Sequence, residues 1–287
     1  MSTKKPHHPG KPRSTGRPDA RPPGSGASRR PPPRGGDGDR RPPAPPPDTV
    51  YLWGTHAVVE ALGSLRRKVL RISATEGAAE RVAELAADRG VPVTVVCAEA
   101  ISARLPRDAV HQGLLLEARR IEPIALDDVP DDGVVLILDQ ITDPHNVGAI
   151  LRTAAAFGVS ALVMQDRHAP DLGGTLAKAA SGGLEHVPVA LVVNLARTLD
   201  KLGERGFLRV GLDSDGDGSL EAMELPRPLA LVLGSEGDGL RRLTRERCDA
   251  VARLDMPGPI KSLNVSIACA VALTVARLKA PTGTTSA

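Results

Sequence analysis

The chain has 287 residues, enough for one or two globular domains, and its composition is uneven. Residues 1–48 hold 14 of the 26 prolines, 11 Lys or Arg and 4 Asp or Glu, with no Val, Ile, Leu or aromatic residue. This segment carries +7 and the other 239 residues carry −4. We predict a disordered basic tail over residues 1–48, because it has too little apolar surface to offset chain entropy. The tail either neutralises nucleic-acid phosphates or only increases solubility.

Several classes of protein are excluded by composition. No uncharged apolar run approaches the roughly 18 residues of a membrane helix, and the first residues lack the apolar core of a signal peptide. Three cysteines, Cys97, Cys248 and Cys269, have no metal-ligand spacing, so we expect small core residues of a reduced, cytoplasmic protein and no metal site. Four aromatic residues are too few for extensive base stacking.

Residues 49–120 are predicted to form a small α/β domain. Capping residues and hydrophobic periodicity predict helices at 54–62, 78–89 and 99–105 and strands at 69–73, 91–97 and 113–118. Residues 121–132, with two prolines and several acidic residues, are predicted to be a linker.

Residues 133–280 are predicted to form a larger α/β domain with a mostly parallel sheet. Apolar runs predict strands at 134–138, 161–165, 207–212, 229–233 and 251–254, and an extended segment at 186–193. Helices are predicted at 147–157, 175–182, 195–205, 239–249 and 265–279. The last helix is apolar nearly all round, so we expect it to be buried in the fold or in a dimer contact.

Polar residues gather in three loops that follow strands of the larger domain, and ligands of open α/β sheets bind at such strand ends. The first loop, 139–146, leads into a helix on which Asn146 is either a helix cap or a functional amide. Arg152 has only Gly or Ala three and four residues away, so no carboxylate of its own helix pairs with it. It is either a solvated surface arginine or a side chain that contacts a phosphate or a second chain.

The second loop is Gly-Ser-Glu-Gly-Asp-Gly at 234–239, whose glycines allow the backbone to approach a ligand closely around Glu236. Its spacing differs from the dinucleotide-binding fingerprint, and a tight turn with a helix-capping acid is the alternative. The third loop, 256–264, contains Ser262 and Asn264, either of which could merely cap the last helix.

A fourth segment, Asp-Ser-Asp-Gly-Asp-Gly at 213–218 with Glu224, matches the pattern of a calcium-binding loop. A predicted strand precedes it and Pro226 and Pro228 follow, so the flanking helices of such a loop are missing. An acidic surface turn is the simpler interpretation.

The order and the amino-acid sequences of the first three loops resemble those of the SpoU/TrmH family of RNA ribose 2′-O-methyltransferases, in the SPOUT superfamily. The three motifs are Asp-Pro-His-Asn-Val-Gly at 143–148 with Arg152, Leu-Gly-Ser-Glu-Gly at 233–237, and Met-Pro-Gly at 256–258 with Ser-Leu-Asn-Val-Ser at 262–266. The resemblance extends from Tyr51 to about Lys279 and is strongest to members that methylate guanosine in bacterial large-subunit (23S) rRNA. A tRNA methyltransferase and a non-catalytic RNA-binding or ribosome-assembly factor are the alternatives.

The resemblance implies a fold, a cofactor and a set of roles. The fold would be a SPOUT α/β trefoil-knot methyltransferase domain, preceded by a small α/β ribosomal-protein-like RNA-binding domain and the basic tail. The protein would bind S-adenosylmethionine and RNA and work as a homodimer, away from membranes. The expected catalytic cluster is Asn146, Arg152, Glu236, Ser262 and Asn264, and the expected cofactor contacts are Gly234, Leu254, Met256, Ile260 and Leu263.

Overall fold

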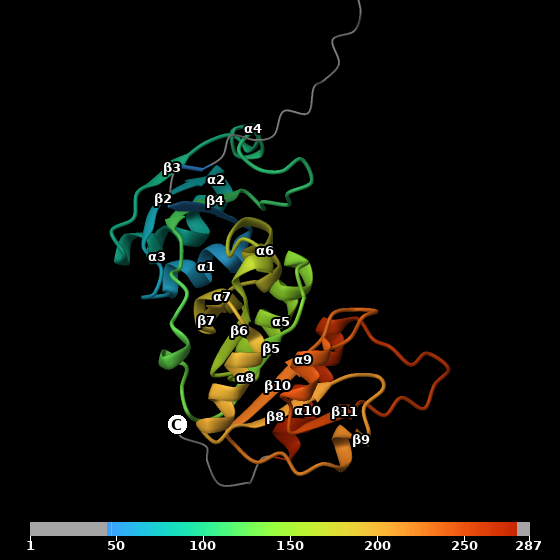
Figure 1. Ribbon diagram of the computed structural model, residues 1–287. Helices are drawn as coiled ribbons and strands as arrows, with labels where there is room; N and C mark the ends of the chain where they lie inside the picture. The colour runs from blue at the N-terminus through green and yellow to red at the C-terminus, as the bar shows by residue number, and fades with distance from the viewer. Residues whose placement is uncertain (1–44, 47, 280–287) are drawn as a thin grey trace, which may run out of the picture. The chain divides into compact units, whose positions relative to one another are not determined.

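The computed structural model describes residues 45–46 and 48–279 (Figure 1). The predicted basic tail therefore lies almost wholly outside the described residues. No helix within these residues is long and apolar enough to cross a membrane. The described residues belong to one compact unit, so the division into 49–120, 121–132 and 133–280 stays a prediction. We refer to residues 49–120 as the small unit and to residues 133–279 as the large unit.

The small unit is built on a four-stranded mixed sheet in the order β1-β4-β2-β3. Its strands are β1 (Thr49–Trp53), β2 (Val69–Ala74), β3 (Val93–Val95) and β4 (Leu114–Arg119), with β4 antiparallel to both β1 and β2. Its helices are α1 (Thr55–Gly63), α2 (Glu76–Ala79), α3 (Ala83–Asp88) and α4 (Ala98–Ser102). The sequence did not predict β1, whose five residues are all buried and lack the alternation of a half-buried strand.

The large unit contains a seven-stranded sheet in the order β7-β6-β5-β10-β8-β11-β9, and every neighbouring pair is parallel. Its strands are β5 (Val134–Leu138), β6 (Ala161–Gln165), β7 (Val189–Val192), β8 (Leu208–Leu212), β9 (Gly218–Ser219), β10 (Leu229–Leu233) and β11 (Ala250–Arg253). This confirms the predicted parallel α/β architecture; the trefoil knot stays a prediction.

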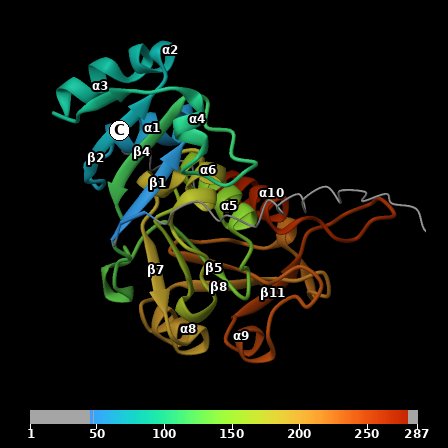
Figure 2. The ribbon, with the colours of Figure 1, turned by 90° about the horizontal axis from the view of Figure 1, so that it is seen from above.

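Helices cover both faces of the large sheet (Figure 2). They are α5 (Pro144–Ala156), α6 (Gly174–Ala180), α7 (Gly183–His186), α8 (Leu195–Glu204), α9 (Arg242–Glu246) and α10 (Val265–Leu278). Alternate residues of β5 point to opposite faces. Leu136 joins a hydrophobic cluster with α5, α6, α7 and α10, and Ile137 joins another with α8. The first cluster continues into α1 and the small sheet, so the two units share one core.

The start of α5 corrects the helix predicted from residue 147. The helix begins three residues earlier, because Asp143 caps it by accepting a hydrogen bond from the backbone N–H of His145 and Pro144 occupies the first turn. Asn146 therefore lies inside the first turn and is not the cap, which leaves its amide available for other contacts.

Three further expectations need correction. The segment predicted as extended from residue 186 begins only at β7, and the short helix α7 precedes it, separated from α6 by left-handed backbone at Ser181 and Gly182. Helix α9 is five residues long, much shorter than the predicted 239–249.

Cys97 is exposed, at the N-terminus of α4, so it is not a core residue. Burial does hold for Cys269 and partly for Cys248, and it raises the pKa of each thiol to about 12.

Helix α10 is buried along only one side. Val265, Cys269, Ala272, Leu273 and Ala276 face the core. Ile267, Val271 and Leu278 are exposed at spacings that place them on one stripe of the opposite face. The predicted all-round apolar helix thus leaves an apolar stripe uncovered in the single chain.

Candidate active site

Glu236 is the centre of a hydrogen-bonded cluster at the carboxyl ends of β5 and β10. Because these strands are parallel neighbours, the loops that follow them meet at one edge of the sheet. The Oε1 atom of Glu236 accepts hydrogen bonds from Asn146 Nδ2 at 3.3 Å, Asn264 Nδ2 at 2.7 Å and the backbone N–H of Val265 at 3.1 Å. The structure thus joins three of the five predicted catalytic residues.

Asn264 has both functions that the sequence left open. Its Oδ1 atom caps α10 by accepting a hydrogen bond from the backbone N–H of Ser266 at 3.0 Å. Its Nδ2 atom donates to Glu236 and to Asn146 Oδ1, the latter at 2.9 Å. One amide therefore fixes the start of α10 and orients the two other polar side chains.

Arg152 does not join this cluster in the single chain. It follows Asn146 by six residues on α5, about 9 Å along the axis and about 120° around it. Its side chain is exposed and, within residues 45–46 and 48–279, makes no hydrogen bond or ion pair. The same exposed helix face carries His145, Ala149 and Ala156. Arg152 is therefore free to contact a ligand or a second chain.

A cavity of about 610 Å³ opens beside the cluster, between the loops that follow β8, β10 and β11. Four of the five predicted cofactor contacts line it, namely Gly234, Leu254, Met256 and Leu263, and so does Ser262. Ile260 is not among the lining residues and is 72% exposed. Its contact with a cofactor stays a prediction.

The walls of the cavity suit a cationic ligand with apolar and hydrogen-bonding parts. Four carboxylates line it, those of Asp213, Asp215, Glu236 and Asp238, against the two basic side chains of Arg245 and Lys261. Residues 234–239, which we call the glycine loop, form a turn that is closed by a hydrogen bond from the N–H of Gly239 to the carbonyl oxygen of Ser235. A sulfonium compound such as S-adenosylmethionine fits this combination of negative charge, apolar wall and exposed backbone.

Sequence reasoning missed two ion pairs of the loops around this cavity, of which only the first has residues in the cavity wall. Arg245 Nη1 lies 3.3 Å from Asp213 Oδ2, and Arg241 Nε donates to Asp139 Oδ1, which is fully buried at the end of β5. The sequence indicates for Asp213 only a place in a calcium-binding pattern. It follows β8, and Oδ1 and Oδ2 accept hydrogen bonds from the N–H groups of Asp215 and Leu240.

The calcium interpretation has no structural support. The loop is flanked by the strands β8 and β9 instead of two helices. Among the residues that the structure describes, no group of three or more His, Cys, Asp or Glu side chains is placed to hold a metal ion.

Comparison with known proteins decides the family. The SpoU rRNA Methylase family model matches residues 133–274, and the model for RNA 2′-O ribose methyltransferase substrate binding matches residues 51–124. The 23S rRNA (guanosine-2′-O-)-methyltransferase RlmB of Bordetella pertussis is 40% identical over 234 residues, 78% of this chain and 95% of that protein. The chain belongs to the SpoU family of RNA methyltransferases. It is therefore an S-adenosylmethionine-dependent enzyme that acts on RNA.

Two further relatives extend over most of this SpoU methyltransferase. Bacillus subtilis YacO, whose name assigns it to TrmH family tRNA/rRNA methyltransferases, is 38% identical over 81% of this chain and 97% of its own length. The crystal structure of AviRb from Streptomyces viridochromogenes with AdoMet superposes with a TM-score of 0.70 at 21% identity, over 81% of this chain and 92% of that one. The latter likeness supports the fold of both units.

The glycine loop gives the first testable prediction. A Cβ atom on Gly234 would lie 2.3 Å from the carbonyl carbon of Gly239, so alanine must displace the cavity wall. We expect Gly234→Ala to weaken S-adenosylmethionine binding by about tenfold, a typical cost of overpacking. Gly258→Ala is the control, because its Cβ would meet no atom within 4 Å. Isothermal titration calorimetry measures both; equal affinities for the two variants would contradict the placement of the cofactor.

Proposed function

We propose that this SpoU methyltransferase transfers a methyl group to the ribose 2′-oxygen of a guanosine in 23S rRNA, and that it acts in the cytoplasm as a homodimer. The observation that carries the reaction is the Asn146–Glu236–Asn264 cluster at the mouth of a negatively lined cavity. The choice of RNA is supported by RlmB of Bordetella pertussis, which is similar across both units.

The cofactor, when bound, supplies an electrophilic methyl group on a sulfonium sulfur. The residues of the chain must present a ribose hydroxyl in line with that methyl and stabilise the oxygen as it loses its proton. Glu236 is held in one orientation by three donors, so its carboxylate can orient the cationic donor and a ribose hydroxyl. Ser262, also in the cavity wall, can donate or accept a hydrogen bond at the same place.

Arg152 is proposed to stabilise the developing alkoxide and the neighbouring phosphate. An arginine side chain keeps its proton in proteins, so it acts through charge and bidentate hydrogen bonds instead of as a general base. Since Arg152 lies on another face of α5 from Asn146, we propose that it reaches the cluster of a second copy of the chain.

The homodimer itself is proposed from α10. Ile267 is 54% exposed, and Val271 and Leu278 continue its apolar stripe. Such a stripe on an otherwise well-packed helix is typical of a surface that is covered in an oligomer. Asn264 caps the first turn of α10, so a dimer contact along this helix would lie next to the cluster that Arg152 must reach.

The experiment that tests the proposal is methyl transfer from labelled S-adenosylmethionine to total RNA separated into tRNA, small rRNA and large rRNA. The large rRNA must come from a strain that lacks the modification. Label in 23S rRNA at one guanosine, resistant to alkaline cleavage, is the expected result. Label in tRNA would change the substrate, an alternative that the name of YacO keeps open. Cofactor binding without transfer to any fraction would favour a non-catalytic RNA-binding factor.

A further inference from the structure

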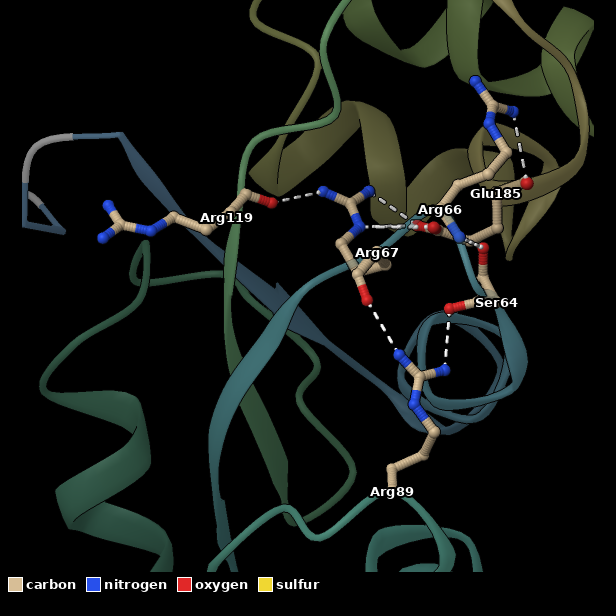
Figure 3. Close-up of polar contacts among 6 residues, drawn as sticks. All are labelled: Ser64, Arg66, Arg67, Arg89, Arg119 and Glu185. Carbon is tan, nitrogen blue, oxygen red and sulfur yellow. Dashed lines mark hydrogen bonds and ion pairs between the residues drawn. The ribbon is translucent and has the colours of Figure 1, made fainter.

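A buried ion pair joins the small unit to the large unit. The guanidinium of Arg67, in the turn between α1 and β2, donates through Nε and Nη2 to both carboxylate oxygens of Glu185 on α7, with a shortest distance of 2.6 Å (Figure 3). The side chains are 0% and 3% exposed, and Arg67 Nη1 also donates to the carbonyl oxygen of Arg119. The contact is thus bidentate, fully desolvated and fixed in direction.

Helix α7 has further contacts with the small unit on either side of this ion pair. Arg66 Nη1 donates to the carbonyl oxygen of Glu185, and His186 Nε2 lies 2.8 Å from Glu60 Oε2 of α1. Arg89 braces the turn that carries Arg67 by donating to the carbonyl oxygens of Ser64 and Arg67 (Figure 3). It also donates to the carbonyl oxygen of Leu62. Both partners of the ion pair are therefore held in place by their own neighbours.

The opposite side of α7 packs closely against the backbone of α5 at Leu151 and Arg152. A Cβ atom on Gly183 would lie 2.6 Å from the carbonyl oxygen of Leu151 and 2.8 Å from the backbone nitrogen of Arg152. Only glycine allows the two backbones to approach so closely. A continuous path of packed atoms thus runs from the small unit, through Arg67, Glu185 and α7, to the backbone of Arg152.

Stability alone does not explain this arrangement. A buried ion pair costs so much desolvation that apolar replacements of similar volume are often neutral or stabilising. The shared apolar core already holds the units together, but apolar contact is non-directional and specifies their relative position less sharply. A bidentate guanidinium–carboxylate contact supplies direction, because its hydrogen bonds form in one geometry.

We infer that Arg67 and Glu185 are positioning residues for methyl transfer: they fix the RNA-binding small unit against the helix that carries Arg152, so that bound RNA meets that arginine in register. This inference rests on the proposed function, since it assumes that RNA held by the small unit is the methyl acceptor. Neither residue touches the cavity, so neither is expected to affect cofactor binding.

The test replaces Arg67 and Glu185 together, so that neither residue is left as a buried charge without its partner. The double variant Arg67→Met/Glu185→Leu keeps the volume and removes the directional contact. The measured quantity is kcat/KM for a long 23S rRNA fragment divided by kcat/KM for a short oligonucleotide that holds only the target guanosine and its neighbours. We expect this ratio to fall by about tenfold or more, because small misplacements of a reactant cost that much. S-adenosylmethionine affinity should stay unchanged.

The control is Arg209→Met/Asp249→Leu, which removes a multiply hydrogen-bonded, partly exposed ion pair within the large unit. It should leave the ratio unchanged. If Arg67→Met/Glu185→Leu fails to fold, the double variant Glu60→Gln/Arg66→Ala takes its place. It removes the exposed contacts of α7 with the small unit beside the ion pair, and it should lower the ratio by less than about tenfold. An unchanged ratio in a folded, active double variant would overturn the inference. So would equal losses on both RNAs and on cofactor binding, which indicate general destabilisation.

A second measurement does not depend on activity and separates this inference from the proposed function. A spin label on Cys97, the exposed thiol of the small unit, and one on Glu204→Cys of α8 report the distance between the units. We expect a narrow distance distribution in the parent and the control, and a broad one in Arg67→Met/Glu185→Leu. If the parent enzyme is inactive on 23S rRNA but shows a narrow distance distribution, only the proposed substrate is wrong. If the parent, the control and the double variant all show equally narrow distributions, the inference that Arg67 and Glu185 fix the two units is overturned.

Discussion

Arg152→Ala is expected to lower kcat for methyl transfer by about 10³-fold, because it removes the positive charge that stabilises the developing alkoxide. S-adenosylmethionine affinity should change little, since Arg152 is not among the residues that line the cavity. Single-turnover transfer to unmodified 23S rRNA and calorimetry measure the two quantities. Arg152→Lys should recover only part of the rate, because lysine lacks the planar fork that binds a phosphate in bidentate fashion. A rate in Arg152→Lys that rises steeply with pH would instead indicate general-base catalysis.

Mixed dimers test whether Arg152 acts on the partner's site. In a dimer of one Arg152→Ala chain and one Asn264→Ala chain, action across the interface leaves one site with both natural residues and one with neither. Action within a chain leaves both sites damaged. We expect the mixed dimer to be active while each parent homodimer is not. An inactive mixed dimer would contradict the proposal that Arg152 acts at the site of the other chain.

Glu236→Ala is expected to lower kcat by about 10²–10³-fold, because one carboxylate oxygen accepts hydrogen bonds from Asn146, Asn264 and the backbone of Val265. Glu236→Gln keeps an acceptor oxygen and loses the charge, so its rate should fall between those of the parent and the alanine variant. Asp238→Asn is the control, since it removes a carboxylate from the same loop outside the cluster. Rates for Asp238→Asn and Glu236→Ala that fall equally would mean that only the charge of the cavity matters.

The strands show where sequence reasoning is reliable. The bounds of β5, β6 and β10 agree with the predicted ones. β5 and β10 are continuous apolar runs bounded by polar or turn residues, and β6 is such a run that ends at Gln165. Helix starts were less well determined. Asp143 and Asn146 are both good capping residues, and only the observed backbone shows that Asp143 is the cap.

The short helix α7 shows a different limit. Four residues are too few for a hydrophobic period, so nothing local distinguishes this helix from an extended segment. The requirement for glycine at 183 comes from the backbone of α5, and the requirement for Glu185 comes from Arg67, 118 residues earlier in the chain. Neither partner can be read from the residues around α7.

Hydrophobic patterns and short motifs were enough to predict the alternation of strands and helices, the polar loops at strand ends and, from the residues in those loops, the family. These are local properties, fixed by hydrophobic periodicity and turn chemistry over a few residues. The resemblance predicted that Asn146, Glu236 and Asn264 belong to one cluster, 118 residues separating the two asparagines. The folded chain adds the hydrogen bonds that join these three side chains and shows that Arg152 faces away from them. The three side chains meet because of the strand order: β10 pairs with β5 across an intervening run of helices and strands, and no local pattern encodes which strands become neighbours.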